Sequence, residues 1–307
     1  MNLPQKVIMF GGKGGVGKTT TSAASALHFS SLGEKTLILS TDPVLSLSDM
    51  FEKKIGDKET LIAENLYAVE LSSDEVLRRW KEKFGDEVYE VLSSFAQVDY
   101  DIIDYIGGAP GIDEEFMLDY ILELADKGEY DRIVWDTAPA GHTMRLLNMP
   151  VQFIEHLDAA ARVYMSMKDS MDKLQRAAGI KRSRRSIFDI IDSWKELAEE
   201  IAGFLRDGEK VGFAGVTIPE ALGIYQIERI ISDFDAYGLK TGHIIINGVI
   251  QEADCEFHRA RMQMQKGYIE RIRQNYGSIA QIIEIPLFHY EIKGIEKLQV
   301  VVEKLFG

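Results

Sequence analysis

A glycine-rich segment near the start of the chain reads Gly11-Gly12-Lys13-Gly14-Gly15-Val16-Gly17-Lys18-Thr19-Thr20. It follows the apolar run Lys6 to Phe10 and leads into Thr20 to Leu32, a stretch of small residues with helical character. Glycines permit backbone angles that are closed to other residues, so successive N–H groups can turn inward around an anion. The succession of strand, glycine loop and helix therefore predicts a phosphate-binding loop.

Two polar side chains of this segment suit a nucleotide bound with Mg²⁺. We expect Lys18 to reach the β- and γ-phosphates of ATP or ADP and the Thr19 hydroxyl to ligate Mg²⁺. The helix that begins here would direct the positive end of its dipole at the phosphates. The segment's expected nucleotide-binding residues are Gly12, Lys13, Gly14, Gly15, Val16, Gly17, Lys18, Thr19 and Thr20.

The composition limits the kinds of partner. The 307 residues are 46% hydrophobic and 27% charged, as in an ordinary globular protein. A formal net charge of −14 argues against a nucleic-acid groove and against general attraction to anionic membranes. The single cysteine, Cys255, excludes an intrachain disulfide framework, and no apolar run is long enough to span a bilayer. We expect a cytoplasmic protein that binds no nucleic acid and does not insert into membranes.

Apolar, β-branched runs alternate with helical segments along the chain. This alternation predicts an α/β fold with a doubly wound, mostly parallel sheet of about seven strands, as in P-loop proteins, with helices on both faces. The expected strands are Val7 to Phe10, Thr36 to Ser40, Leu66 to Leu71, Arg132 to Trp135, Gly212 to Ile218, His243 to Val249 and Gln281 to Ile285.

Two inserts, at 73–127 and 151–207, interrupt this alternation. Each carries apolar residues at helical spacing, so we expect the two inserts to form one α-helical subdomain. The remaining residues, 1–72, 128–150 and 208–307, would form the core of a single P-loop domain.

Two aspartates follow expected strands beside the phosphate loop, where ligands bind in open α/β sheets. Asp42 comes after the strand that ends at Ser40. It could orient or deprotonate an attacking water or hold a metal-bound water, although Asp-Pro is also a common turn starter. Asp136 closes an apolar strand, like a Walker B aspartate, and would reach Mg²⁺ through Thr19 or a water molecule.

The early lysine of the glycine segment, Lys13, carries further information. The loop Lys13 to Thr19 resembles the deviant Walker A motif of dimeric ATPases that include nitrogenase iron protein, partitioning and septum-site ATPases, and the arsenite and tail-anchored-protein ATPases. In that superfamily the early lysine crosses the subunit interface to the partner's nucleotide. Such a cation stabilises the transferring phosphoryl group only when the dimer is closed, so Lys13 is a second candidate catalytic residue.

Further segments resemble the arsenical pump and guided-entry ATPases, from the first strand to the last. Asp42 to Asp49 looks like switch I of that family, and Asp136 to Thr143 looks like switch II. The other matching stretches are Ala109 to Glu114, Ile218 to Leu222, Pro286 to Leu287 and Glu291 to Gly294. The similarity covers nearly the whole chain and suggests a single-half member from an archaeon or a bacterium.

This resemblance implies ATP hydrolysis in a homodimer, with Asp42 as the catalytic residue. It also implies nucleotide contacts from Glu220, Asn247 and Pro286. Asn247 is followed by Gly248-Val249 and not by the lysine and aspartate of a guanine-reading motif, which favours adenine. A buried asparagine that caps the end of a strand is the structural alternative.

The guided-entry branch of the family also suggests what the inserts bind. Resemblance to it implies that the inserts of a homodimer together form a groove for the transmembrane helix of a tail-anchored membrane protein, with a membrane receptor as a further partner. Most apolar residues of the inserts would pack helix on helix. The cluster Met165, Met167 and Met171 is less well explained in that way, because methionines suit surfaces that accept varied apolar partners.

A metal site at the dimer interface is a further expectation from the resemblance. In the guided-entry ATPases a Cys-x-x-Cys pair from each subunit holds a shared zinc. The matching place here reads Cys255-Glu256-Phe257-His258. Cysteine and histidine both ligate zinc, so two subunits could build a tetrahedral site with Cys255 and His258; a metal-free helix start is the alternative.

Two other functions stay open at this point. Driving an arsenite pump would require soft thiolate ligands, commonly three, and one cysteine per chain does not supply them. A partitioning or septum-positioning switch would be expected to end in a basic amphipathic anchor. The C-terminal stretch Glu296 to Phe306 is amphipathic but balances lysine with glutamate.

Overall fold

The computed structural model describes residues 1–40, 46–95, 97–109, 112–137, 187–236 and 238–307. The chain divides into two compact units. The first, the sheet unit, comprises Met1–Ser72, Ile121–Met144 and Phe204–Gly307, and the second, the helical unit, comprises Ser73–Tyr120 and Arg145–Gly203.

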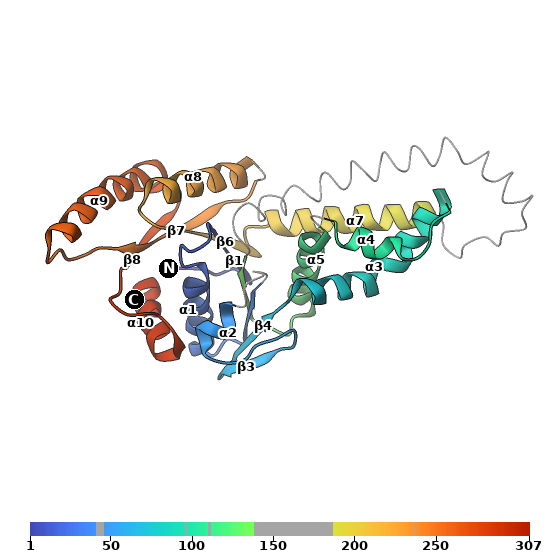
Figure 1. The fold of residues 1–307 in the computed structure, drawn as a ribbon, viewed down its shortest axis with the longest axis horizontal. Coiled ribbons are helices and arrows are strands. Elements are labelled where there is room, and N and C mark those ends of the chain that lie inside the picture. The colour runs from blue at the N-terminus through green and yellow to red at the C-terminus, as the bar shows by residue number, and fades with distance from the viewer. Residues whose placement is uncertain (41–45, 96, 110–111, 138–186, 237) are drawn as a thin grey trace, which may run out of the picture. The chain divides into compact units, whose positions relative to one another are not determined.

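The sheet unit is built on one eight-stranded sheet (Figure 1). Its strand order is β3-β4-β2-β5-β1-β6-β7-β8, and every neighbouring pair is parallel except β3 with β4. The strands are β1 Val7–Gly12, β2 Thr36–Ser40, β3 Thr60–Ala63, β4 Leu66–Glu70, β5 Arg132–Asp136, β6 Val211–Thr217, β7 Thr241–Val249 and β8 Gln281–Pro286. This confirms the predicted doubly wound, mostly parallel α/β fold.

The predicted number of about seven strands was one short, because β3 escaped notice. It has only four residues, which are partly or fully exposed, and it pairs antiparallel with β4 at the edge of the sheet. Glu64 and Asn65 join the two strands, and Asn65 has a positive φ of 57°. No glycine or proline separates the two strands, so nothing in the sequence marks a hairpin turn after β3.

Helices cover both faces of this sheet (Figure 1). On one face, Ile8 and Phe10 of β1 share an apolar cluster with Leu298 of α10. On the other face, Phe213 of β6 packs against Phe234 of α8, with ring centroids 4.0 Å apart. The described helices that lie wholly in this unit are α1 Lys18–Ser31, α2 Ser46–Phe51, α8 Ala221–Ala236, α9 Glu256–Tyr276 and α10 Gly294–Phe306.

The helical unit contains α3 Ser73–Phe95, α4 Ile102–Gly107, most of α7 Ile187–Arg206 and the first part of α5 Ile112–Lys127. Gly107 allows α4 to approach α3, because a Cβ there would lie 2.4 Å from Leu77 Cδ1. The Trp194 indole N–H of α7 donates to Glu87 of α3 at 2.8 Å. Among the described residues no helix is both long enough and apolar enough to cross a bilayer. The methionine cluster of the sequence analysis lies outside the described residues.

Candidate functional site

The glycine loop lies between the end of β1 at Gly12 and the start of α1 at Lys18. Gly15 and Gly17 have φ angles of 78° and 97°, where a residue with a Cβ is strained. A Cβ on Gly17 would also lie 2.2 Å from Asn247 Nδ2. Position 17 therefore requires glycine both for its backbone angle and for the close approach of Asn247.

Lys18 is almost completely buried at the start of α1, with 5% of its surface exposed. Its ammonium group donates to the carbonyl oxygen of Lys13 at 3.2 Å, so the side chain folds back across the loop. A lysine in this place carries its charge to where the phosphates of a nucleotide would lie. Lys13 itself is half-buried, and its proposed role in a partner subunit stays a prediction.

Three hydroxyl and carboxylate groups from different elements meet beside the loop. Thr19 Oγ1 donates to Asp136 Oδ2 at 2.7 Å and lies 3.3 Å from Ser46 Oγ. Asp136 is buried at the end of β5, and the pairing of Phe10 with Asp136 brings it next to β1. Oxygen atoms are the ligands that Mg²⁺ prefers, directly or through water, so this donor set fits the metal.

Glu70 is a site residue that the sequence analysis missed. It ends β4, and Ser40 of β2 pairs with both Glu70 and Asp136 in the sheet. Its buried carboxylate accepts the backbone N–H groups of Leu47 at 2.6 Å and Ser48 at 3.1 Å, and also the Ser48 hydroxyl. The signal was available, because Glu70 closes an apolar strand just as Asp136 does.

The residues expected to change with the nucleotide are only partly described. Asp42 belongs to residues 41–45 and lies outside the described residues, as does 138–143 of the second switch. The residues next to each segment form hydrogen bonds within the sheet unit. After the first segment, the first turn of α2 donates to Glu70, and before the second, the Thr137 hydroxyl donates to the Phe10 carbonyl oxygen at 2.8 Å. The role of Asp42 therefore stays a prediction.

A cavity of about 390 Å³ lies beside the loop within the sheet unit. Thr20, Asn247 and Pro286, which the sequence analysis expects at the nucleotide, all line it. The Asn247 amide donates to the Val16 carbonyl oxygen at 2.9 Å, which ties the end of β7 to the loop. Glu220 does not line this cavity, and its carboxylate pairs with Arg261 of α9.

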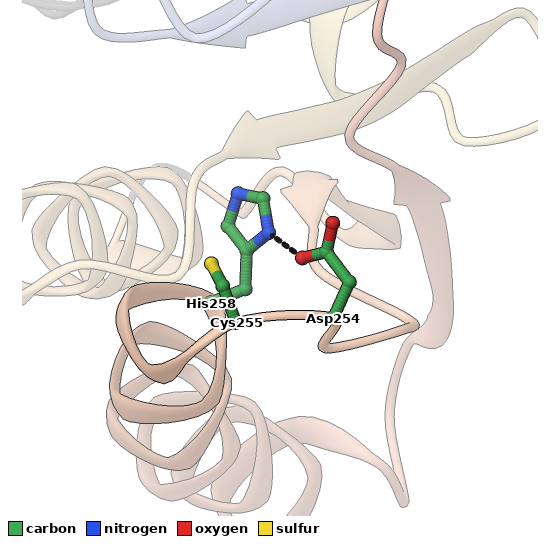
Figure 2. Close-up of side chains that lie close together, drawn as sticks. All are labelled: Asp254, Cys255 and His258. Carbon is green, nitrogen blue, oxygen red and sulfur yellow. Dashed lines mark hydrogen bonds and ion pairs between the residues drawn. The ribbon is translucent and has the colours of Figure 1, made fainter.

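The candidate zinc ligands lie at the start of α9 (Figure 2). Cys255 is exposed and precedes the first residue of the helix, and His258 lies in its first turn. A third residue, Asp254, joins them: its Oδ1 lies 2.6 Å from His258 Nδ1, and ligand atoms of all three residues lie within 4.8 Å of one another. Sulfur and imidazole donors fit zinc. Asp254 was not singled out from the sequence, although it stands four residues before His258.

A second cavity, of about 260 Å³, lies within the helical unit. Its wall is almost entirely apolar, and the acidic side chain on it, Asp119, forms an ion pair with Lys83. The lining side chains are Trp80, Phe84, Val88, Val91, Leu92, Ile106, Ile112, Asp119, Trp194, Leu197, Ala198 and Ile201. This wall joins α3 and α7, one from each insert.

Comparison with known proteins identifies the family to which this chain belongs. The family described as anion-transporting ATPase matches residues 5–307. This chain belongs to that family. Similar proteins include ATPase ASNA1 homolog 1 from Paramecium tetraurelia, 33% identical over 97% of this chain and 91% of the relative. ATPase GET3 from Mycosarcoma maydis is 32% identical over 96% of this chain and 88% of its own length.

Family membership confirms the resemblance to the arsenical pump and guided-entry ATPases, and the chain is an ATPase. It therefore binds a nucleotide, and the phosphate loop with Lys18 and Thr19 is where the sequence predicts that binding. The individual roles of Lys13, Asp42 and Asn247 stay predictions.

Proposed function

We propose that this ATPase is a cytoplasmic homodimer that couples ATP binding and hydrolysis to the binding and delivery of transmembrane segments of tail-anchored membrane proteins. The observation that carries the proposal is the apolar cavity between α3 and α7 in the helical unit. Phe84, Leu92 and Leu197 of its wall are half-buried, so their side chains retain surface that an apolar ligand would cover.

The size of this cavity supports a shared groove. A transmembrane helix needs about 20 residues to span the roughly 30 Å of a bilayer core. A cavity of about 260 Å³ holds only a few side chains of such a helix. A second copy of the chain would supply a second apolar wall, so the complete groove would require the homodimer.

The ATP site would control this groove through the dimer. Lys18 balances phosphate charge, Asn247 contacts adenine, and Lys13 reaches the nucleotide of the partner subunit. Bound Mg²⁺ supplies further neutralisation of the phosphates near Thr19 and Asp136. Asp42 positions the attacking water, and Glu70 holds the helix that follows Asp42. Client and nucleotide influence each other only if each binds one state of the dimer, open or closed, better than the other.

Two finer elements complete the proposal. A zinc ion bound by Cys255 and His258 of both subunits would stabilise the dimer. A membrane receptor would accept the client from the ATPase.

Photo-crosslinking tests the client site directly. A photoreactive amino acid in place of Leu197 is expected to crosslink to the transmembrane segment of a tail-anchored protein, since Leu197 lines the apolar cavity. The matched control is the same replacement of Leu222, which is 54% exposed on α8 in the sheet unit. Equal crosslinking at the two positions would contradict the proposed site. A severalfold rise in ATPase rate on addition of arsenite would favour the arsenite-transport alternative.

A further inference from the structure

The geometry at the start of α9 points to a specific role for Asp254. We propose that Asp254 is a positioning residue that holds His258 so that its Nε2 atom, together with Cys255 Sγ, forms half of a zinc site. A second copy of the chain would supply the other two ligands. This inference rests on the homodimer of the proposed function and adds to it a residue, a tautomer and a ligand atom.

The first step of the argument is the hydrogen bond between Asp254 and His258. Asp254 Oδ1 lies 2.6 Å from His258 Nδ1, which is a hydrogen-bonding distance. An ionised carboxylate only accepts hydrogen bonds, so the proton lies on Nδ1. A neutral imidazole with its proton on Nδ1 has its lone pair on Nε2, which is the form that ligates a metal.

The same distance shows that Asp254 Oδ1 and His258 Nδ1 are not ligands of one zinc ion. With metal–ligand bonds of about 2.0 to 2.2 Å in a tetrahedron, two ligand atoms on one zinc lie roughly 3.3 Å apart. The 2.6 Å separation of Oδ1 and Nδ1 is a hydrogen bond. Histidine ligands usually donate their second N–H to a carboxylate in this way, and the carboxylate fixes the orientation of the ring.

The position of Cys255 completes the half-site. Figure 2 shows the Cys255 sulfur beside the His258 ring, and ligand atoms of Asp254, Cys255 and His258 lie within 4.8 Å of one another. Cys255 takes the N-cap position of α9 with an extended backbone, and its side chain makes no capping hydrogen bond. The sulfur is therefore not used to cap the helix.

The surroundings suit completion by a second copy of the chain. Cys255 is exposed, and the His258 side chain is 40% exposed. Phe257, which directly precedes His258, is 66% exposed, which is unusual for a large aromatic side chain. Two ligands from one chain leave a tetrahedral zinc half coordinated, and two copies give Cys₂His₂.

Cobalt titration of the full chain tests this role, because Co²⁺ reports its ligands through its visible spectrum. We expect the Asp254→Asn variant to bind Co²⁺ on the order of 10- to 100-fold more weakly, with ligand-field and sulfur charge-transfer bands like those of the unsubstituted chain. Cys255→Ser is expected to abolish the sulfur band. The matched control is Glu252→Gln, which removes an exposed carboxylate two residues earlier and is expected to change neither affinity nor spectrum.

Three outcomes would overturn the proposal. Unchanged affinity in Asp254→Asn would show that the carboxylate does not position His258, and a changed spectrum would make Asp254 a direct ligand. Absence of Co²⁺ binding to the unsubstituted chain would remove the site altogether.

Metal content and assembly separate this inference from the proposed function. We expect about half an atom of zinc per chain in the purified dimer. ATP hydrolysis and client crosslinking, measured on the same samples, report the proposed function independently. Loss of zinc in Asp254→Asn with both activities retained supports the inference, whereas full zinc content in that variant contradicts it even if both activities fail.

Discussion

The carboxylate of Glu70 accepts the backbone N–H of Leu47 at 2.6 Å and so joins the end of β4 to the first turn of α2. The Ser48 N–H and hydroxyl donate to the same carboxylate, which is 3% exposed. The first N–H groups of a helix have no partner within it, so a buried acceptor there fixes where the helix begins. Because α2 follows the segment that contains Asp42, Glu70 sets the position at which the predicted catalytic segment ends.

Replacement of Glu70 by glutamine is expected to reduce turnover. An amide in this place has one acceptor fewer and turns N–H groups toward N–H donors, at a cost of about 1–3 kcal/mol in unfolding free energy. We expect kcat to fall while KM for ATP changes little, since the loop contacts remain. Glu64→Gln, an exposed carboxylate in the adjacent β3–β4 turn, is the control. Unchanged kcat in a folded Glu70→Gln protein would contradict this role.

The Thr19 hydroxyl is expected to be essential for Mg²⁺-dependent hydrolysis. It donates to Asp136 and lies beside Ser46, so its removal takes one oxygen from the predicted metal site. Thr19→Ala should lower kcat at least about 100-fold, equivalent to at least about 2.7 kcal/mol of transition-state stabilisation. Thr19→Ser, which keeps the hydroxyl, should restore most of the activity in a Mg²⁺ titration. A Thr19→Ser protein as inactive as Thr19→Ala would show that the hydroxyl is not the group that matters.

Two glycines with positive φ provide a matched test of the loop. Gly17 and Gly33 have φ angles of 97° and 87°, but only Gly17 has a neighbour in the way, the Asn247 amide. Gly33→Ala should lose roughly 1 kcal/mol of stability through backbone strain and still bind ATP. Gly17→Ala should abolish ATP binding, because its methyl group displaces either the loop or Asn247. Calorimetric titration with ATP measures both, and normal binding by Gly17→Ala would refute the close approach.

Mixing two inactive variants tests whether Lys13 acts across the dimer. Lys13→Ala and Lys18→Ala should each be inactive alone. In a mixed dimer, the site of the Lys13→Ala chain keeps its own Lys18 and receives Lys13 from the other chain. The mixture should then recover about a quarter of the unsubstituted rate if the sites act independently. No recovery, in a mixture shown to exchange subunits, would indicate that Lys13 acts within its own chain.

Stability at acid pH should depend on His243. Burial in β7 lowers the pKa of His243 to about 4, with a smaller contribution from the positively charged N-terminus. Between the ordinary pKa near 6.5 and about 4, the unfolded chain binds a proton that the folded chain excludes, so stability is lost as the pH falls through this range. His243→Gln should therefore lose less stability than the unsubstituted chain between pH 7.5 and pH 5. Parallel losses in urea unfolding would contradict the prediction.

The sequence predicted the central sheet because its parallel strands are buried on both faces and appear as continuous apolar runs, such as Thr36–Ser40. It did not reveal β3, whose four residues lie at an exposed edge. Within the site, the glycine loop and Asp136 could be predicted because each is recognised from the order of residues in one short segment. Glu70 closes an apolar strand, and Asp254 stands four residues before His258, so the sequence contained a signal for each. Their hydrogen bonds to Leu47 and His258 become apparent only when the backbone brings donor and acceptor together.

The central claim is that ATP-bound dimers hold transmembrane segments, and co-purification tests it most directly. The full chain carrying Asp42→Asn, which should bind ATP without hydrolysing it, is mixed with a tail-anchored protein in the presence of ATP and Mg²⁺. We predict a stable complex that is lost when the transmembrane segment of the client is deleted. Failure to capture the intact client, in a protein that still binds ATP and dimerises, would contradict the account.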